Sequence, residues 1–235
     1  MLRSGFVVLP FLLLFHTAQA APPSHQQWDQ LLRKHVSASG AVSYKGFKQD
    51  QALLQAYLDS LAVQTPQPGW TQNARLAYWI NAYNAFTVKL ILDHYPLKSI
   101  RDLGKPWDLK FITLGGQPYS LNDIEHTILR KQFSEPRIHF AVNCASKSCP
   151  PLLNQAYTAD RVQSQLARQA SGFINDRRFN QIGAQSASLS KIFEWYQADF
   201  VKNGTLIDYL NRYATIKLTA GATLTYMEYD WSLNE

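Results

Sequence analysis

The sequence predicts an α+β protein that is rich in helix, with a small, mainly antiparallel sheet and one buried central helix. Three observations support this fold class. Segments with apolar residues at helical spacing dominate the chain, short alternating segments come between them, and one helical segment is apolar all round. Because helices and strands do not alternate regularly, a parallel α/β sheet is not expected.

The first 20 residues are typical of a secretory signal peptide. They contain Arg3, an apolar run from Phe6 to Phe15, and the small-residue pattern Ala18-Gln19-Ala20. The apolar run is shorter than the roughly 20 residues that cross a bilayer. We therefore expect cleavage near Ala20, no transmembrane helix afterwards, and a periplasmic or secreted protein.

The chain is expected to comprise a signal peptide (1–20), an N-terminal helix and connector (21–43) and a single globular domain (44–235). No low-complexity segment or long linker divides it. The formal net charge is +6 at pH 7, with basic residues dispersed singly or in pairs. Dispersed charge on an exported protein argues against nucleic acid as a partner.

The first half of the chain is expected to contain helices over residues 25–36, 48–62 and 71–95. An extended segment is predicted over residues 41–47. The third helix is the longest and should end before Pro96. Its apolar side chains point in all directions, so it should lie in the middle of the fold, against a strand that begins at Arg137.

The remaining elements are shorter. A β-hairpin is expected around Gly115-Gly116, because glycines suit a tight turn between alternating segments. Two short strands are expected around Gly183-Ala184, and a last strand within residues 222–234. Further helices are predicted over residues 97–103, 120–133 and 205–213, and from a cap at Thr158 or Asp160 to about residue 175. Residues 190–200 form an amphipathic, aromatic segment.

Most groups that could perform covalent chemistry lie in the stretch RIHFAVNCASKSCPPL, residues 137–152. It is predicted to begin as a buried strand and to end at a pair of prolines, which cannot continue a ladder. It contains His139, Cys144 and Cys149. A thiol carried from a strand into a polar loop is typical of an active site, and also of a small structural disulfide.

Cys144 is the better candidate nucleophile, because loop amides can converge on it as oxyanion donors, whereas prolines after Cys149 remove N–H donors. The candidate bases are His139 and His126. Regular strand geometry would place His139 and Cys144 on opposite faces, a difficulty that His126 on the preceding helix does not have. Glu125 falls within the apolar stripe of that helix, where a carboxylate is a candidate acid or orienting group.

Four more polar residues are candidates for binding or positioning. Asn81 and Asn84 lie one turn apart on the buried helix, where each amide must be hydrogen-bonded, either to backbone or to a catalytic imidazole. Asn143 and Ser148 lie beside the two cysteines. No local ligand spacing predicts a metal site, and no cofactor is expected.

Five blocks of the sequence, in order, resemble one family: YWINAYNAFTV, SLNDIEHTILR, RIHFAVNCASKSCPPL, SKIFEWYQADF and YDWSLN. The chain resembles the bacterial, exported branch of the domain of unknown function 547 family over about residues 44–234. The resemblance implies one compact domain. It also implies that some members of the family have a cysteine like Cys144 and lack one like Cys149. The family has no established activity to carry over.

Two function hypotheses follow. The first is an exported thiol-dependent hydrolase or acyl transferase with papain-like or transglutaminase-like chemistry, in which Cys144 attacks a peptide or small amide. The second is a non-enzymatic periplasmic binding or scaffolding domain in which Cys144 and Cys149 form a disulfide. The reactivity of Cys144 distinguishes them.

Overall fold

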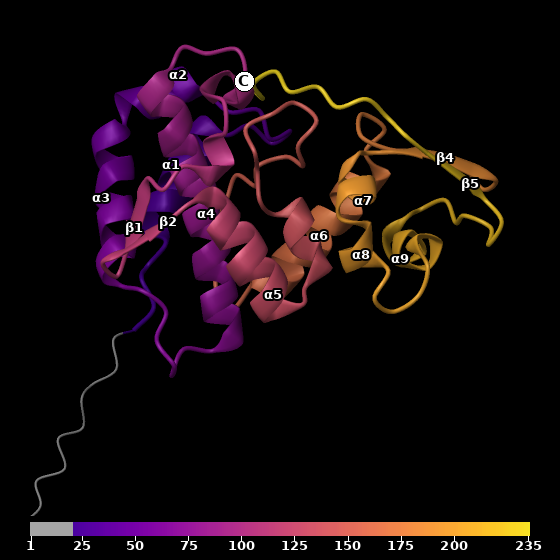
Figure 1. Ribbon diagram of the computed structural model, residues 1–235, viewed down its shortest axis with the longest axis horizontal. Helices are drawn as coiled ribbons and strands as arrows, with labels where there is room; N and C mark the ends of the chain where they lie inside the picture. Colours follow the sequence, from indigo (N-terminus) through magenta and orange to yellow (C-terminus); the bar gives the residue numbers. More distant parts are fainter. Residues whose placement is uncertain (1–20) are drawn as a thin grey trace, which may run out of the picture.

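The computed structural model describes residues 21–235, and the signal peptide predicted for residues 1–20 lies outside them. Helices and short strands gather into two adjoining hydrophobic clusters (Figure 1). The predicted helix-rich α+β class is confirmed, and the strand pairs are mostly antiparallel with one parallel pair. Among the described residues, no helix combines the length and the apolar character needed to cross a bilayer.

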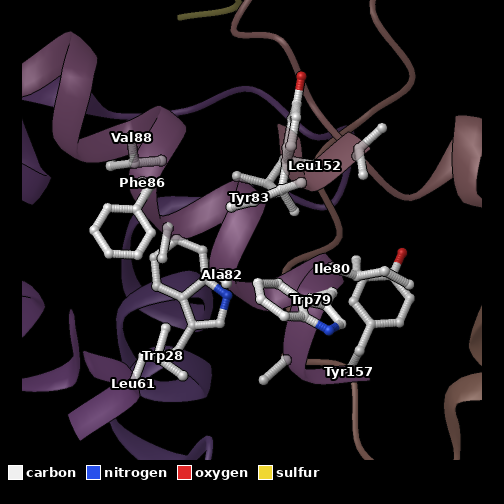
Figure 2. Close-up of a cluster of buried hydrophobic side chains, with 14 of the residues drawn as sticks. Trp28, Leu61, Trp79, Ile80, Ala82, Tyr83, Phe86, Val88, Leu152 and Tyr157 are labelled. Carbon is white, nitrogen blue, oxygen red and sulfur yellow. The ribbon is translucent and has the colours of Figure 1, made fainter. Parts of the chain in front are cut away.

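Helix α4 (Gln72–His94) is the buried centre of the larger cluster, as its all-round apolar pattern predicts. Its side chains are buried on every face, including Trp79, Tyr83 and Phe86 (Figure 2). Helices α2 (Tyr44–Gln49) and α3 (Gln51–Val63) pack against it, and α1 (Gln26–His35) packs against α2 and α3. The helix begins where the Thr71 side chain accepts a hydrogen bond from the Ala74 N–H, and it ends before Pro96 as expected.

The extended segment predicted over residues 41–47 is wrong from Tyr44 onward, where α2 begins. The Ser43 hydroxyl caps this helix by accepting a hydrogen bond of 3.2 Å from the Gly46 N–H. Only Val42 keeps extended pairing, in an isolated bridge to Val36. A local cap therefore outweighed the alternating pattern of side chains.

The predicted hairpin is present as β1 (Ile112–Leu114) and β2 (Gln117–Tyr119). Gly115 and Gly116 have φ angles of 58° and 75°, which side chains other than glycine rarely adopt. Two 3₁₀ turns precede the hairpin, η1 (Ile100–Leu103) and η2 (Pro106–Asp108).

The predicted helix over residues 120–133 is present but is not regular. Its middle is a π-helix, η3 (Asp123–Leu129), which continues into α5 (Arg130–Phe133). The Asp123 carboxylate holds the start by accepting from the N–H and the hydroxyl of Ser120. Because π-helical turns occur frequently at functional sites, this segment becomes a candidate for the site.

The strand predicted to begin at Arg137 is wrong. Residues Pro136–Phe140 form a 3₁₀ helix, η4. Proline suits the first position of a helix, and the Glu135 carboxylate accepts a hydrogen bond of 3.1 Å from the Arg137 N–H. Helix α4 is instead hydrogen-bonded through Asn84 to the loop that follows η4, and strand alternation does not separate His139 from the cysteines.

The smaller cluster is built on α6 (Val162–Asn175) and on the aromatic side chains Phe140, Phe173 and Phe200. The amphipathic, aromatic segment over residues 190–200 forms two short helices that meet at Tyr196. The elements around this cluster are α7 (Ile192–Trp195), α8 (Gln197–Phe200), α9 (Leu206–Tyr213), β3 (Gln181–Ile182), β4 (Ser186–Leu189) and β5 (Thr223–Tyr226). Strand β4 pairs antiparallel with β3 and parallel with β5.

After β5 the chain returns across the molecule towards α2 (Figure 1). Along the way the Leu233 N–H bonds the Lys98 carbonyl at 3.0 Å, and the Asn234 N–H bonds the Ala145 carbonyl at 3.2 Å. The Tyr44 hydroxyl donates to Asn234 Oδ1 at 2.7 Å. The last residues therefore fasten the loop that carries the cysteines to the larger cluster.

Replacing Asn84 by alanine should lower the free energy of unfolding by about 2–4 kcal/mol, because two buried backbone groups lose their partner. Its amide donates to the Ala141 carbonyl at 2.9 Å, and Oδ1 accepts from the Asn143 N–H at 2.8 Å. Urea denaturation measures the change. The exposed control Asn203→Ala should stay within about 0.5 kcal/mol of wild type, and equal effects of the two variants would contradict the prediction.

Candidate active site

A cavity of about 390 Å³ lies between side chains of the two clusters. It is lined by residues of η2, η3, η4, the loop that carries the cysteines, α7 and the C-terminal segment. Four residues predicted from the sequence meet there: Glu125, His126, His139 and Cys144. Cys149 also reaches the cavity.

The other predicted site residues do not line this cavity. The Asn81 amide makes two hydrogen bonds to the main chain of Tyr157, donating to its carbonyl at 2.8 Å and accepting from its N–H at 3.0 Å. Asn84 likewise donates to the Ala141 carbonyl and accepts from the Asn143 N–H. Asn143 donates to the Pro150 carbonyl, and the Ser148 hydroxyl accepts from the Asp230 N–H. All four therefore hold the backbone that surrounds the cavity.

His139 is paired with a carboxylate that the sequence reasoning missed, Asp199 on α8. His139 Nε2 lies 2.8 Å from Asp199 Oδ2. The ionised carboxylate can only accept, so Nε2 carries the proton and Nδ1 of the neutral ring is a free acceptor. Nδ1 is buried and has no hydrogen-bond partner. The ring stacks on Tyr196 with centroids 3.9 Å apart, which fixes its orientation.

Burial lowers the pKa of His139, although the hydrogen bond to Asp199 opposes this effect. In turn, the hydrogen bond to His139 holds the pKa of Asp199 well below its ordinary value, with a further contribution from Arg130. The pair therefore consists of a neutral imidazole and a carboxylate at neutral pH. This is the protonation state that a general base requires.

His126 is in a different situation. Its Nδ1 lies 3.0 Å from a guanidinium nitrogen of Arg130, whose Nε bonds Asp199 at 2.6 Å. Because arginine only donates, Nδ1 of His126 is the acceptor and Nε2 carries the proton of the neutral ring. His126 can therefore offer a donor, whereas His139 has the unoccupied acceptor of a base.

Both cysteines are free thiols. The Cys144 sulfur lies 3.1 Å from the Ser146 hydroxyl and 3.2 Å from the Tyr229 hydroxyl. Burial raises the pKa of Cys144, but hydrogen bonds from Cys149, Ser146 and Tyr229 outweigh it and bring the pKa to about 7. Burial and the neighbouring Cys144 raise the pKa of Cys149 well above its usual value. Cys144 is therefore the thiol that ionises.

The backbone amides after Cys144 do not provide the expected oxyanion site, because each already has an acceptor. The Cys144 N–H donates to the Cys149 sulfur, the Ala145 N–H to Asn143 Oδ1 and the Ser146 N–H to the Cys144 sulfur. The N–H groups of Lys147, Ser148 and Cys149 donate to the carbonyls of Ser232, Asp230 and Ser146, respectively. The donors next to the thiol are therefore two side-chain hydroxyls, those of Ser146 at 3.1 Å and Tyr229 at 3.2 Å. Of these, Tyr229 also belongs to the cavity lining.

Ala145 has a φ of 62°, a conformation that residues with a side chain rarely adopt. Its N–H is held by the Asn143 side chain at 2.9 Å, and its own carbonyl accepts from Asn234. Strained backbone of this kind is found at functional sites when surrounding contacts fix it. Here the strained residue directly follows Cys144, which lines the cavity.

Four aromatic side chains line one side of the cavity, and we call them the aromatic wall: Trp107, Trp195, Tyr229 and Trp231. Their ring centroids lie 4.5 to 5.8 Å apart in successive pairs. Trp195 is 47% exposed, so the wall reaches the surface. The only sequence signal for it was the richness of the last two family-like blocks in tryptophan and tyrosine.

Within residues 21–235, no group of three or more histidine, cysteine, aspartate or glutamate residues is placed to hold a metal ion.

Residues 68–174 match the model of a family described as protein of unknown function, DUF547, so the chain carries a DUF547 domain over these residues. Nothing among curated proteins or solved structures matches the chain. The matched region includes Glu125, His139 and both cysteines, and it ends before Asp199 and the C-terminal part of the aromatic wall.

Proposed function

We propose that this chain, with its DUF547 domain over residues 68–174, is an exported thiol-dependent hydrolase or acyl transferase that acts on peptide or amide bonds. The observation that carries the proposal is one cavity lined by both Cys144 and His139, the latter hydrogen-bonded through Nε2 to Asp199. A thiol, an imidazole and a carboxylate are the nucleophile, base and orienting group of this chemistry.

In the first step, the Cys144 thiol gives its proton to Nδ1 of His139, and the sulfur attacks the carbonyl carbon of the substrate. A carbon–sulfur bond forms while the carbonyl oxygen becomes an oxyanion, to which the Tyr229 hydroxyl donates. The carbon–nitrogen bond then breaks, and the leaving amine takes the proton from His139. The product of this step is a thioester on Cys144.

In the second step, a water molecule or a second amine attacks the thioester and gives a proton to His139. The carbon–sulfur bond breaks, and the sulfur recovers that proton. Asp199 accepts a hydrogen bond from Nε2 throughout, which stabilises the imidazolium formed in each step.

The Cys144 sulfur is hydrogen-bonded to Ser146 and Tyr229, and the Nε2 of His139 is bonded to Asp199. Catalytic hydrogen bonds are often long in free enzymes and form when substrate binds. A substrate carbonyl that takes the Tyr229 hydroxyl would free the sulfur to turn towards His139. Substrate binding and thiol activation are therefore coupled in this proposal.

A non-enzymatic binding domain is the second candidate, and the aromatic wall favours it. Partly exposed tryptophans at the mouth of a cavity are common in binding sites that perform no chemistry. The two candidates differ in whether a covalent intermediate forms on Cys144.

The protein should form an acyl adduct on Cys144 when mixed with a p-nitrophenyl ester, with a burst of nitrophenol of about one equivalent per chain. Intact-mass spectrometry and peptide mapping locate the adduct. Cys144→Ala should give no adduct, and Cys149→Ala should still give it, more slowly, because Cys144 loses a hydrogen-bond donor. An adduct that persists in Cys144→Ala, or no adduct in the folded, reduced wild type, would rule out the proposal.

A further inference from the structure

The Glu125 carboxylate has an unusual position in this cavity. The residue is only 4% exposed, it lies on the π-helix η3, and it lines the cavity. It takes part in none of the ion pairs within residues 21–235. The Tyr196 hydroxyl, which is neutral, is hydrogen-bonded to its carboxylate. A carboxylate removed from water without a cation is costly, and a ligand can supply that cation.

The basic residues around Glu125 are engaged elsewhere. Arg130 interacts electrostatically with Glu125, but its guanidinium bonds Asp199 at 2.6 Å, and Lys202 also lies 3.8 Å from Asp199. His139 is bonded to the same aspartate, and His126 accepts from Arg130. Exposed Lys105 and Asp108, which also line the cavity, contribute opposite charges. Among the described residues of the cavity lining, Glu125 is therefore a buried carboxylate with no cation of its own.

The aromatic wall favours the same kind of ligand. The faces of tryptophan and tyrosine rings are negative and attract cations, most strongly when water is excluded. The Arg101 guanidinium already lies over the Trp231 ring, 5.3 Å from its centroid. The wall continues from there to Tyr229, beside the Cys144 sulfur. A cation would therefore meet aromatic faces on its way to the carboxylate.

We infer that the cavity binds the ammonium group of an amine-bearing ligand, with the cation between the Glu125 carboxylate and the aromatic wall. The ligand is the substrate only if the proposed function holds, in which case the enzyme acts on amides or peptides that carry a basic group near the reacting carbonyl. A ligand with a carboxylate in the same place would be repelled by Glu125.

Binding is tested in the Cys144→Ala variant, which has no nucleophile, so that the result does not depend on catalysis. Three probes of equal length differ in charge: hexylammonium, 1-hexanol and hexanoate. Tryptophan fluorescence and calorimetry measure their dissociation constants. Hexylammonium should bind at least about tenfold more tightly than hexanol, and hexanoate more weakly than either.

Glu125→Gln in the same background should reduce the preference for hexylammonium over hexanol to about twofold or less. Glu194→Gln is the matched control, because Glu194 is exposed and pairs with Lys191 outside the cavity; it should keep the full preference. Trp195→Leu, which keeps apolar surface at an exposed position, should weaken hexylammonium by about two- to fivefold and leave hexanol nearly unchanged.

Equal binding of the three probes, or a cation preference that survives Glu125→Gln, would overturn the inference. Thermal melting of each variant shows whether it is folded. If Glu125→Gln does not fold, the inference is judged on whether Trp195→Leu weakens the binding of hexylammonium. If the cavity prefers hexylammonium but the wild type forms no acyl adduct on Cys144, the proposed function is wrong and the protein is an amine-binding domain.

Discussion

Asp199→Asn is expected to slow acylation of Cys144 by about 10²–10⁴-fold, because the proton acceptor of the reaction depends on this carboxylate. In the wild type, Asp199 accepts a hydrogen bond of 2.8 Å from the Nε2–H of His139, which leaves Nδ1 free to take the thiol proton. A neutral amide does not stabilise the imidazolium. It can also donate to Nε2, which would move the ring proton to Nδ1 and remove the base.

The rate of nitrophenol release in the burst phase measures this effect directly. Lys202→Gln is the matched control, because Lys202 lies 3.8 Å from the same carboxylate on the exposed side and does not contact the histidine. It should acylate within about twofold of wild type, as surface ion pairs contribute little. Since Asp199→Asn also weakens the contact with Arg130, thermal melting must show that the variant is folded at the assay temperature.

A loss of acylation without a change in the thiol would assign the effect to the base. Cys144 takes its hydrogen bonds from Ser146, Tyr229 and Cys149, none of which contacts Asp199. The pH midpoint of Cys144 alkylation should therefore be the same in Asp199→Asn and wild type. Unchanged acylation in Asp199→Asn would exclude the His139–Asp199 pair and return attention to His126.

Helix α4 was predictable because its composition alone implies burial on every face, and α1 because Trp28, Leu31, Leu32 and His35 form one stripe. The η4 turn was not predicted, although its signals were local. Pro136 at the first helical position and the capping Glu135 carboxylate outweighed the alternation of Ile138, Phe140 and Val142.

The candidate site was only half predictable. Glu125, His139 and Cys144 are chemically unusual for their local patterns, so each could be selected from its own segment. Asp199 and Tyr229 could not, because acidic and aromatic residues are ordinary in an amphipathic helix or a terminal turn. Their roles arise from tertiary contacts with residues 60 and 85 positions away in the chain.

Cys144 should react with iodoacetamide in the native, reduced protein with a midpoint near pH 7, against about 8.5 for an ordinary thiol. Burial opposes ionisation here, so the lowered pKa depends on donors to the sulfur. A donor stabilises the thiolate and not the thiol. Removing one must therefore raise the pKa, and the fraction of reactive thiolate at neutral pH must fall.

Tyr229→Phe removes such a donor at 3.2 Å and should raise the midpoint by about one pH unit, which slows alkylation at pH 6 by about tenfold. Tyr226→Phe is the control from the same C-terminal segment, since Tyr226 lies on β5 with its ring beside Lys191. Its midpoint should equal that of wild type. A Tyr229→Phe midpoint that does not move would show that the hydroxyl does not hold the thiolate.

Oxidation gives the same prediction a second readout. The Cys144 N–H donates to the Cys149 sulfur at 2.9 Å and the two thiols interact, so an oxidant that joins the sulfurs, with loss of both thiol protons and two electrons, would block the nucleophile. In protein taken from an oxidising compartment, iodoacetamide should then label Cys144 only in the fraction of molecules whose thiols are reduced. Brief treatment with a thiol reductant should restore labelling and acylation together. If the disulfide forms stoichiometrically and resists reduction in the folded protein, Cys144 is not a working nucleophile, and the cavity belongs to a binding domain.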